Sequence, residues 1–153
     1  MSLIEEAGLT PAAGLDGLAQ MRKLIASGRK PGILVSLEFD FIEVEAGRAI
    51  FAGVPGDHAY NPIGTVHGGY AATLLDSACG CAVHSCLTAT QAYTTLELKV
   101  AYHKAVTRET GLLQAEGRVL SIGRRAAFAE ATLKDMSGRL FASATSTLLV
   151  MER

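Results

Sequence analysis

The chain has 153 residues, of which 49% are hydrophobic and 19% are charged. This length fits a single domain, residues 1–153, and the apolar content is high enough to build a core, which argues against a disordered chain. The formal net charge of −1 provides no basic footprint for a nucleic acid or for an acidic membrane surface.

The N-terminal part of the chain predicts one helix. The first residues, MSLIEEAGLTP, have acidic side chains where a secretory signal would have basic ones, so we expect no signal peptide. A helix is predicted over about residues 15–27, with Asp16 at its first turn and SGRKPG at its end. It would cover the core or line the mouth of a binding tunnel with the apolar side chains that share one face: Leu15, Leu18, Met21, Leu24 and Ile25.

Strand patterns follow this helix, so the core of the fold is expected over about residues 33–151. Four apolar residues alternate with Ser36, Glu38 and Asp40, which predicts a half-buried strand: Val35, Leu37, Phe39 and Phe41. A turn at EAG and a short partner strand over residues 48–54 come next. The segment PGDHAYNPIG, residues 55–64, has the composition of a loop.

The segment from Tyr70 to Leu87 is apolar around almost the whole circumference of a helix. Its length approaches that of a membrane span, but ionisable groups interrupt it, and these are costly at bilayer depth. We therefore predict a helix enclosed within the protein and no membrane partner. The polar and small residues of this helix fall in one narrow stripe: Thr73, Asp76, Ser77, Gly80 and His84.

Four strands are predicted after the central helix, over residues 93–102, 112–120, 126–134 and 140–150. Short turns between successive strands predict an antiparallel meander. In the first strand, Leu96, Leu98, Val100 and Tyr102 are expected on one face. One long sheet and one apolar helix bury each other only if the sheet curls around the helix. The fold class is therefore α+β, with a curved antiparallel sheet of about six strands around a long helix and an extra N-terminal helix.

A candidate site lies at the start of the central helix, in the run His67-Gly68-Gly69. A helix start leaves backbone N–H groups without partners and bears partial positive charge, and glycine lets a ligand approach the backbone. The Gly68 and Gly69 amides could hold a carbonyl oxygen as negative charge builds on it. Asp76 lies about two turns further along the axis, so we expect a second copy of the chain to bring its Asp76 beside Gly68.

Simpler interpretations of these residues stay open. Glycines before a helix are often only turn residues, and a lone helical aspartate most often lies on a solvated face. Asp76 is flanked by Leu74, Leu75, Ala78 and Cys79, which leaves little room for such a face. A buried carboxylate without a partner has a raised pKa and a desolvation cost, and such a cost favours a functional role.

The stretch HGGYAATLLDSACGCAV resembles the hotdog-fold acyl-CoA thioesterases, in the branch of the phenylacetic-acid-pathway and 4-hydroxybenzoyl-CoA thioesterases. Asn61, His67-Gly68-Gly69 and Asp76 stand in that family's spacing, and the resemblance covers roughly residues 34–150. It implies a hotdog fold and a homodimer with two sites across its interface, often paired into a tetramer. It also implies hydrolysis of an aryl or medium-chain acyl-CoA, with no cofactor beyond the CoA of the substrate.

The same resemblance implies roles for individual residues. Asp76 would be the nucleophile or the base that activates water, and the Gly68 amide would polarise the thioester carbonyl. Asn61 would position the water or the carbonyl, and His67 would shape the loop. Thr94 would help to hold the water.

Substrate binding is expected from Gly69 and from two basic residues. Arg124 and Arg125 stand in a predicted turn, where they could bind a CoA phosphate or could simply be solvated. Lys104 and Arg108 are equally ambiguous.

Three cysteines lie close together in the apolar segment: Cys79, Cys81 and Cys86. An odd number on one element is a poor disulfide framework, and reduced thiols are typical of a cytoplasmic protein, which is the location we expect. Cys79 and Cys81 point to different faces of a helix, which is poor metal geometry. We predict buried structural cysteines and no metal site.

Two other functions remain as alternatives. The chain could bind acyl-CoA without turnover, as a regulatory module on the same fold, and Asp76 would then serve the interface. It could also be a hydroxyacyl dehydratase, although His67 followed by two glycines fits that arrangement less well.

Overall fold

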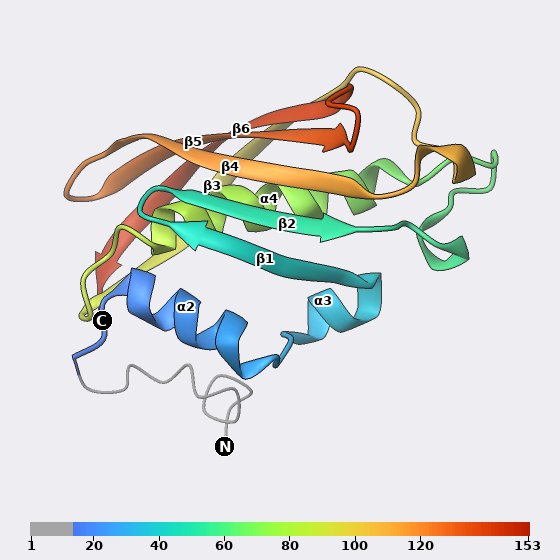
Figure 1. Ribbon diagram of the computed structural model, residues 1–153. Coiled ribbons are helices and arrows are strands. Elements are labelled where there is room, and N and C mark those ends of the chain that lie inside the picture. Colours follow the sequence, from blue (N-terminus) through green and yellow to red (C-terminus); the bar gives the residue numbers. More distant parts are fainter. Residues whose placement is uncertain (1–13) are drawn as a thin grey trace.

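A computed structural model describes residues 14–153 (Figure 1), so the expectation for MSLIEEAGLTP lies outside the described residues. The helices and strands are, in chain order, α2 (Gly17–Ser27), α3 (Gly32–Leu37), β1 (Phe39–Glu45), β2 (Arg48–Gly53), α4 (Gly68–His84), β3 (Gln91–Tyr102), β4 (Leu113–Ile122), β5 (Ala126–Asp135) and β6 (Leu140–Glu152). Two short 3-10 turns lie at Asp57–Ala59 and Arg108–Thr110.

The six strands form one antiparallel sheet in the order β1-β2-β4-β5-β6-β3. The sheet curls around α4, and α4 contacts every strand of it (Figure 1). This arrangement confirms the predicted fold class, a curved sheet around an enclosed helix with an additional N-terminal helix.

The helix α4 lies unusually close to β4 because Gly117 has no side chain. A Cβ atom at Gly117 would lie 2.2 Å from the Ala78 carbonyl oxygen. Leu74, Leu75 and Ala78 are fully buried on this side of the helix. Asp76 and Ser77 remain half-buried, because the curled sheet leaves their face of α4 less covered.

The strand predicted over residues 35–41 is wrong in its first half, since α3 occupies those positions and β1 starts only at Phe39. Pro31 precedes α3 with φ at −53°, and Glu38 ends it with a left-handed φ of 54°. The alternation therefore joined the end of a short helix to the start of a strand. Val35 is 60% exposed as a consequence.

The predicted meander is correct for β4, β5 and β6 and wrong for β3. Instead of lying beside β4, β3 pairs with β6 and forms an edge of the sheet. The connection over residues 103–112 is too long for a hairpin turn and lets the chain cross the end of the sheet (Figure 1).

A bulge between Thr95 and Glu97 changes which residues of β3 face the core. Before the bulge, Tyr93 and Thr95 point inward; after it, Leu98 and Val100 pack against the core. Leu96 lies at the bulge and is 60% exposed, which corrects its predicted place on the inner face. One extra residue reverses the alternation of a strand.

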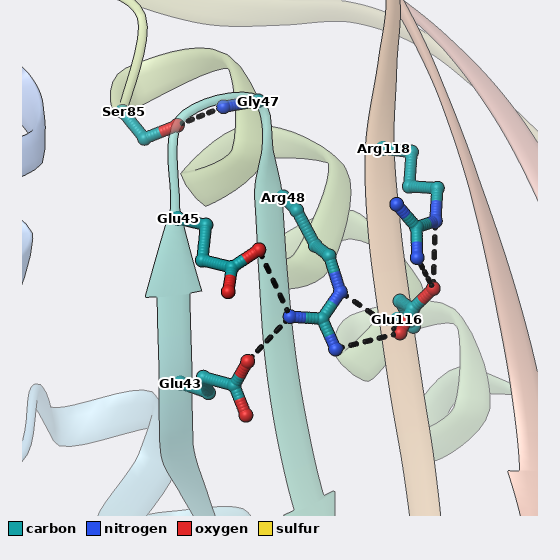
Figure 2. A network of polar contacts seen from close by, with 7 residues as sticks. All are labelled: Glu43, Glu45, Gly47, Arg48, Ser85, Glu116 and Arg118. Atoms are coloured by element: carbon teal, nitrogen blue, oxygen red, sulfur yellow. Dashed lines mark hydrogen bonds and ion pairs between the residues drawn. The ribbon is translucent and has the colours of Figure 1, made fainter.

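Charged contacts fix the register of β1, β2 and β4 on the outer side of the sheet. Figure 2 shows Arg48 of β2 between Glu43 of β1 and Glu116 of β4, with Nε donating to Glu116 at 3.1 Å. The hydrogen bond from Arg48 to Glu43 raises the pKa of the guanidinium further. At the end of α4, the Gly47 N–H donates to the Ser85 hydroxyl at 2.8 Å, which ties the β1–β2 turn to the helix.

The N-terminal helix forms as predicted. Asp16 caps α2 by accepting from the Ala19 N–H at 2.9 Å, and Gly28 ends the helix with a positive φ of 65°. The Gly17 N–H donates to the Leu87 carbonyl at 2.9 Å, which attaches the start of α2 to the end of α4. Both α2 and α3 lie along β1 (Figure 1).

Candidate active site

The first turn of α4 presents one backbone donor without a partner. His67 is the N-cap, and its Nδ1 accepts from the Gly69 N–H at 2.8 Å. The Tyr70 N–H donates to the His67 carbonyl at 3.0 Å. Within residues 14–153, the Gly68 N–H has no acceptor. Of the two glycine amides considered from the sequence, Gly68 therefore has a free donor, whereas the Gly69 donor is already used by His67.

Tyr102, the last residue of β3, packs over the start of α4. Its hydroxyl donates to the Gly68 carbonyl oxygen at 2.8 Å. A Cβ atom at Gly68 would lie 3.0 Å from the Tyr102 ring, so the backbone and the ring are in close contact. The absence of a side chain at Gly68 keeps the approach to its N–H short.

Asp76 lies in the middle of α4, at the border of an apolar pocket. Its Oδ1 accepts from the Thr95 hydroxyl at 3.0 Å. The carboxylate is half-buried in the single chain, less enclosed than the sequence led us to expect. A second acceptor oxygen therefore stays available for water or substrate.

The pocket beside Asp76 has a volume of about 240 Å³, and we call it the Asp76 pocket. It lies on the face of α4 that the sheet leaves open, between β3 on one side and α2, α3 and β1 on the other. Its lining is Leu24, Pro31, Ile33, Leu34, Phe41, Phe51, Asp76, Ser77, Gly80, Cys81, Tyr93 and Thr95. Most of these side chains are apolar, which suits a hydrocarbon or aryl group.

A second pocket of about 310 Å³ opens beside Gly68, and we call it the Gly68 pocket. Its mouth includes His67, Tyr102 and Lys104, and its deeper wall includes Leu133 and Phe141. No ion pair among residues 14–153 involves Lys104, so its ammonium group is available to an anion.

Asp76 and Gly68 do not meet within one chain. They are eight residues apart on the same helix, or about 12 Å along its axis. Each lines a different pocket. The single chain thus contains a carboxylate at an apolar pocket and a free backbone donor at a basic one, and the two are separated.

Asn61 braces the loop before the helix. Its side-chain nitrogen donates to the Thr65 hydroxyl at 2.9 Å, and its side-chain oxygen accepts from the Ile63 N–H at 3.1 Å. Its amide group is therefore engaged within the loop, away from Asp76.

The hydroxyl group that contacts Asp76 belongs to Thr95, the residue after Thr94. Thr94 is exposed on the outer face of β3, and Thr95 is the residue that contacts Asp76. Neighbouring strand residues point to opposite faces. The alternation of Tyr93 and Thr95 toward the core was the available signal, but the bulge that follows concealed it.

Arg124 and Arg125 are exposed in the β4–β5 turn, far from Gly68 of the same chain. The Arg125 carbonyl accepts from the Val150 N–H of β6 at 2.9 Å. Ala142, which lines the Gly68 pocket, lies eight residues back along β6, or about 26 Å away. In one chain these arginines are therefore at the opposite end of the sheet from the Gly68 pocket.

The thiols of α4 are protonated at neutral pH. Burial, together with the negative charge of Asp76, raises the pKa of Cys79 and of Cys81 to about 12. The prediction of buried cysteines is confirmed for Cys79 alone, since Cys81 is half-buried and Cys86 is exposed. Within the described residues, no three His, Cys, Asp or Glu side chains gather as a metal site would require.

The family follows from comparison with known proteins. A family model described as the thioesterase superfamily matches residues 63–142, which is more than half of the chain. The chain belongs to the thioesterase superfamily. This membership supports thioester hydrolysis as the reaction, in line with the resemblance of the His-Gly-Gly and aspartate set. No curated protein sequence matches the chain.

Solved structures of three bacterial proteins share the fold of this chain. A thioesterase family protein from Silicibacter pomeroyi is 26% identical, with a TM-score of 0.76 over 87% of this chain and 96% of that one. A protein from Streptococcus mutans, bound to acetyl-CoA, is 28% identical, with a TM-score of 0.68 over 75% and 90%. A phenylacetic acid degradation-related protein from Ralstonia eutropha is 25% identical, with a TM-score of 0.75 over 84% and 98%.

None of the helices in residues 14–153 has the length and hydropathy needed to span a bilayer. The apolar stretch that suggested such a span lies in α4, which the sheet surrounds.

Proposed function

We propose that this superfamily member hydrolyses acyl-CoA thioesters with aryl or medium-chain acyl groups, at two sites formed where two copies of the chain meet. The main observation that supports this proposal is that the two candidate catalytic groups lie at different positions along α4. Asp76 borders an apolar pocket, and the free Gly68 N–H lies beside a separate pocket with an unpaired lysine. Two α4 helices in antiparallel orientation would bring each Asp76 next to the Gly68 of the partner.

The edge strand β3 supports such a pairing. It is an end of the sheet, it is twelve residues long, and none of the described residues pairs with its outer edge. Exposed edges of this length favour pairing with another chain. The other edge, β1, is flanked by α2 and α3.

Two contacts within the chain support one register for this proposed pairing. Thr95 contacts Asp76, and Tyr102 contacts Gly68. Antiparallel pairing of two β3 strands, centred between Leu98 and Lys99, places Thr95 opposite the partner's Tyr102. The same register therefore brings Asp76 to the free N–H of the partner's Gly68.

In the proposed reaction, the thioester carbonyl oxygen accepts a hydrogen bond from the Gly68 N–H. The partial positive charge of the helix start stabilises negative charge on that oxygen. As a base, Asp76 takes a proton from the water that attacks the carbonyl carbon; as a nucleophile, it forms a mixed anhydride that water then hydrolyses. In both routes the carbon–sulfur bond breaks, the CoA thiolate leaves and is protonated, and the free acid forms. Thr95 orients the carboxylate.

The CoA portion is proposed to lie along basic residues from both copies. In this register, the partner's Lys104 comes level with Tyr93. Tyr93 pairs with Val150, whose N–H reaches the turn of Arg124 and Arg125. The arginines that lie far from Gly68 in one chain would thus stand at the same end as the partner's Lys104, where they can pair with phosphate groups. The acetyl-CoA-bound relative supports a CoA ester as the ligand.

The acyl portion is proposed to enter the Asp76 pocket. Its volume of about 240 Å³ and its phenylalanine and leucine lining suit an aryl or medium-chain group. The relative described as phenylacetic acid degradation-related supports the aryl choice.

A direct assay tests the proposed reaction. The purified chain should release free thiol from phenylacetyl-, benzoyl- or medium-chain acyl-CoA, measured with a disulfide reagent. Asp76→Asn should lower kcat at least ~100-fold, because general base or nucleophilic catalysis is lost. A single turnover in oxygen-18 water identifies a nucleophilic Asp76 by the route in which water attacks the aspartyl carbon of the anhydride, since that route delivers an unlabelled Asp76 oxygen to the acid and leaves the label on Asp76. General-base catalysis puts the label in the acid and none on Asp76. Binding without thiol release would instead identify a non-catalytic module.

Mixing two inactive variants tests the shared site. Gly68→Pro removes the N–H, and proline is tolerated at the first position of a helix. A refolded one-to-one mixture of Asp76→Asn and Gly68→Pro should recover about a quarter of the wild-type activity, because half of the dimers are mixed and each has one intact site. A site within one chain predicts no recovery at all.

A further inference from the structure

The Asp76 pocket shares a wall with another cavity. This second cavity has a volume of about 300 Å³ and lies under the α2–α3 connection, Gly28 to Pro31; we call it the α2–α3 cavity. Four residues line both spaces: Leu24, Pro31, Leu34 and Phe41. The two volumes are therefore neighbours separated only by side chains.

The wall is formed mainly by two leucines. Leu24 of α2 is 6% exposed, and Leu34 of α3 is 5% exposed, so both are closely packed. Phe41 is held by stacking on Phe51, with ring centroids 4.4 Å apart. Pro31 cannot move without changing the start of α3, because its ring fixes φ. The leucines are thus the part of the wall that substitution can open.

Beyond the wall, the α2–α3 cavity ends at a charged rim. Lys30 and Asp40 line it and form an ion pair with each other. Ile25 and Ile42 supply apolar surface between the wall and this rim. An alkyl chain would therefore find hydrocarbon contacts in the cavity, but only if the leucines left a passage.

We infer that Leu24 and Leu34 set the longest acyl chain that the enzyme accepts, by closing the Asp76 pocket against the α2–α3 cavity. This inference depends on the proposed acyl-CoA hydrolysis at Asp76. Each methylene that enters an apolar pocket adds ~4-fold to kcat/KM, from about 0.8 kcal/mol of burial. Carbons beyond the wall gain nothing and must displace packed side chains.

A chain-length series tests the inference. Wild-type enzyme is assayed with straight-chain acyl-CoAs from butanoyl to hexadecanoyl and with ω-phenylalkanoyl-CoAs of increasing length. The rate should rise with length and then fall steeply. Leu24→Ala should raise the chain length at which kcat/KM decreases by about three carbons, the number of carbons that the substitution removes. On the first chain lengths that wild type rejects, kcat/KM of the variant should be at least ~10-fold higher than that of wild type.

A control on the same helix separates loss of packing from opening of the wall. Met21 of α2 is 4% exposed and lines neither cavity. Met21→Ala should lower the melting temperature as Leu24→Ala does, but its dependence of kcat/KM on chain length should be the same as that of wild type. Adding Ile42→Trp to Leu24→Ala should fill the α2–α3 cavity and return the fall to its original length.

A milder variant covers the case in which Leu24→Ala does not fold. Leu34→Val removes one methylene and should extend the accepted length by about one carbon. If the wild-type enzyme is active but the folded wall variants and Met21→Ala share one profile, the inference is overturned and the proposed function stands. If wild type hydrolyses no acyl-CoA of any length, the proposed function itself fails.

Discussion

Asp76 and His84 lie on one stripe of α4, two turns apart, yet the structure treats them differently. Asp76 is half-buried beside a pocket and accepts a single hydrogen bond, from Thr95. His84 is covered by α2: its Nε2 lies 3.0 Å from the Gln20 side-chain oxygen, and the Tyr93 ring meets it edge-on at 5.6 Å. Burial, with a smaller effect from Arg153, lowers the pKa of His84 to about 4.

The difference arises from where the N-terminal helix docks. Gly17 lets α2 pack directly against the end of α4, where a Cβ atom would lie 1.8 Å from the His84 carbonyl oxygen. Near Asp76, α3 takes the place of α2, and the Asp76 pocket lies between α3 and α4. Both side chains are half-buried, but His84 is packed uncharged against Gln20 and Tyr93, whereas Asp76 borders a pocket.

The largest expected effect is the loss of stability at low pH that His84 causes. The folded pKa of His84 lies below its usual 6.5, so the unfolded chain binds the proton more readily. The stabilisation is complete above about pH 6.5 and decreases as the pH falls toward 4. Between pH 7.5 and pH 5, wild type should lose about 2 kcal/mol more unfolding free energy than His84→Gln. Urea titrations at both pH values measure this difference. Equal losses of unfolding free energy in wild type and in His84→Gln would contradict an uncharged, packed His84.

A smaller effect, on activity alone, is expected at the open part of the stripe. Thr95→Val removes the hydroxyl that orients Asp76 and should lower kcat ~10-fold with little change in KM or stability. Thr95→Ser should restore most of the rate. Thr94→Val is the matched control, because Thr94 points to the outer face, and it should leave the rate unchanged. Equal losses at both positions would show that the Thr95 contact has no special role.

The smallest effect is expected where the two copies would hold CoA. Lys104→Ala, and separately the pair Arg124→Ala and Arg125→Ala, should raise KM for acyl-CoA about 5-fold, because each removes an exposed charge from phosphate. Neither should change KM for the same acyl group on N-acetylcysteamine, which has no phosphates. Lys23→Ala, an exposed lysine on α2, serves as the control. An equal rise with both substrates would place these residues outside the CoA site.

Periodicity predicted most elements because burial requires it. The alternation in β4, β5 and β6 and the apolar circumference of α4 follow directly from which side chains must face the core. The prediction failed at two places where a local irregularity of the backbone was hidden by an apparently regular alternation of apolar residues. At Glu38 a short helix runs into a strand, and in β3 a bulge moves the inner face from Thr95 to Leu98. The place of β3 beside β6 was also missed, since pairing depends on contacts far apart in the chain.

The amino-acid sequence alone determined the enclosed helix and the curled sheet, because hydrophobic periodicity acts over a few residues. It also marked Asp76 and Gly68 as unusual for their surroundings. The contact by which His67 occupies the Gly69 N–H and leaves that of Gly68 free is a local one, between residues two apart. Only the tertiary structure decided that Thr95 meets Asp76, and that α2 covers His84 but leaves a pocket at Asp76. These contacts join residues that are far apart in the chain, so no local sequence pattern predicts them.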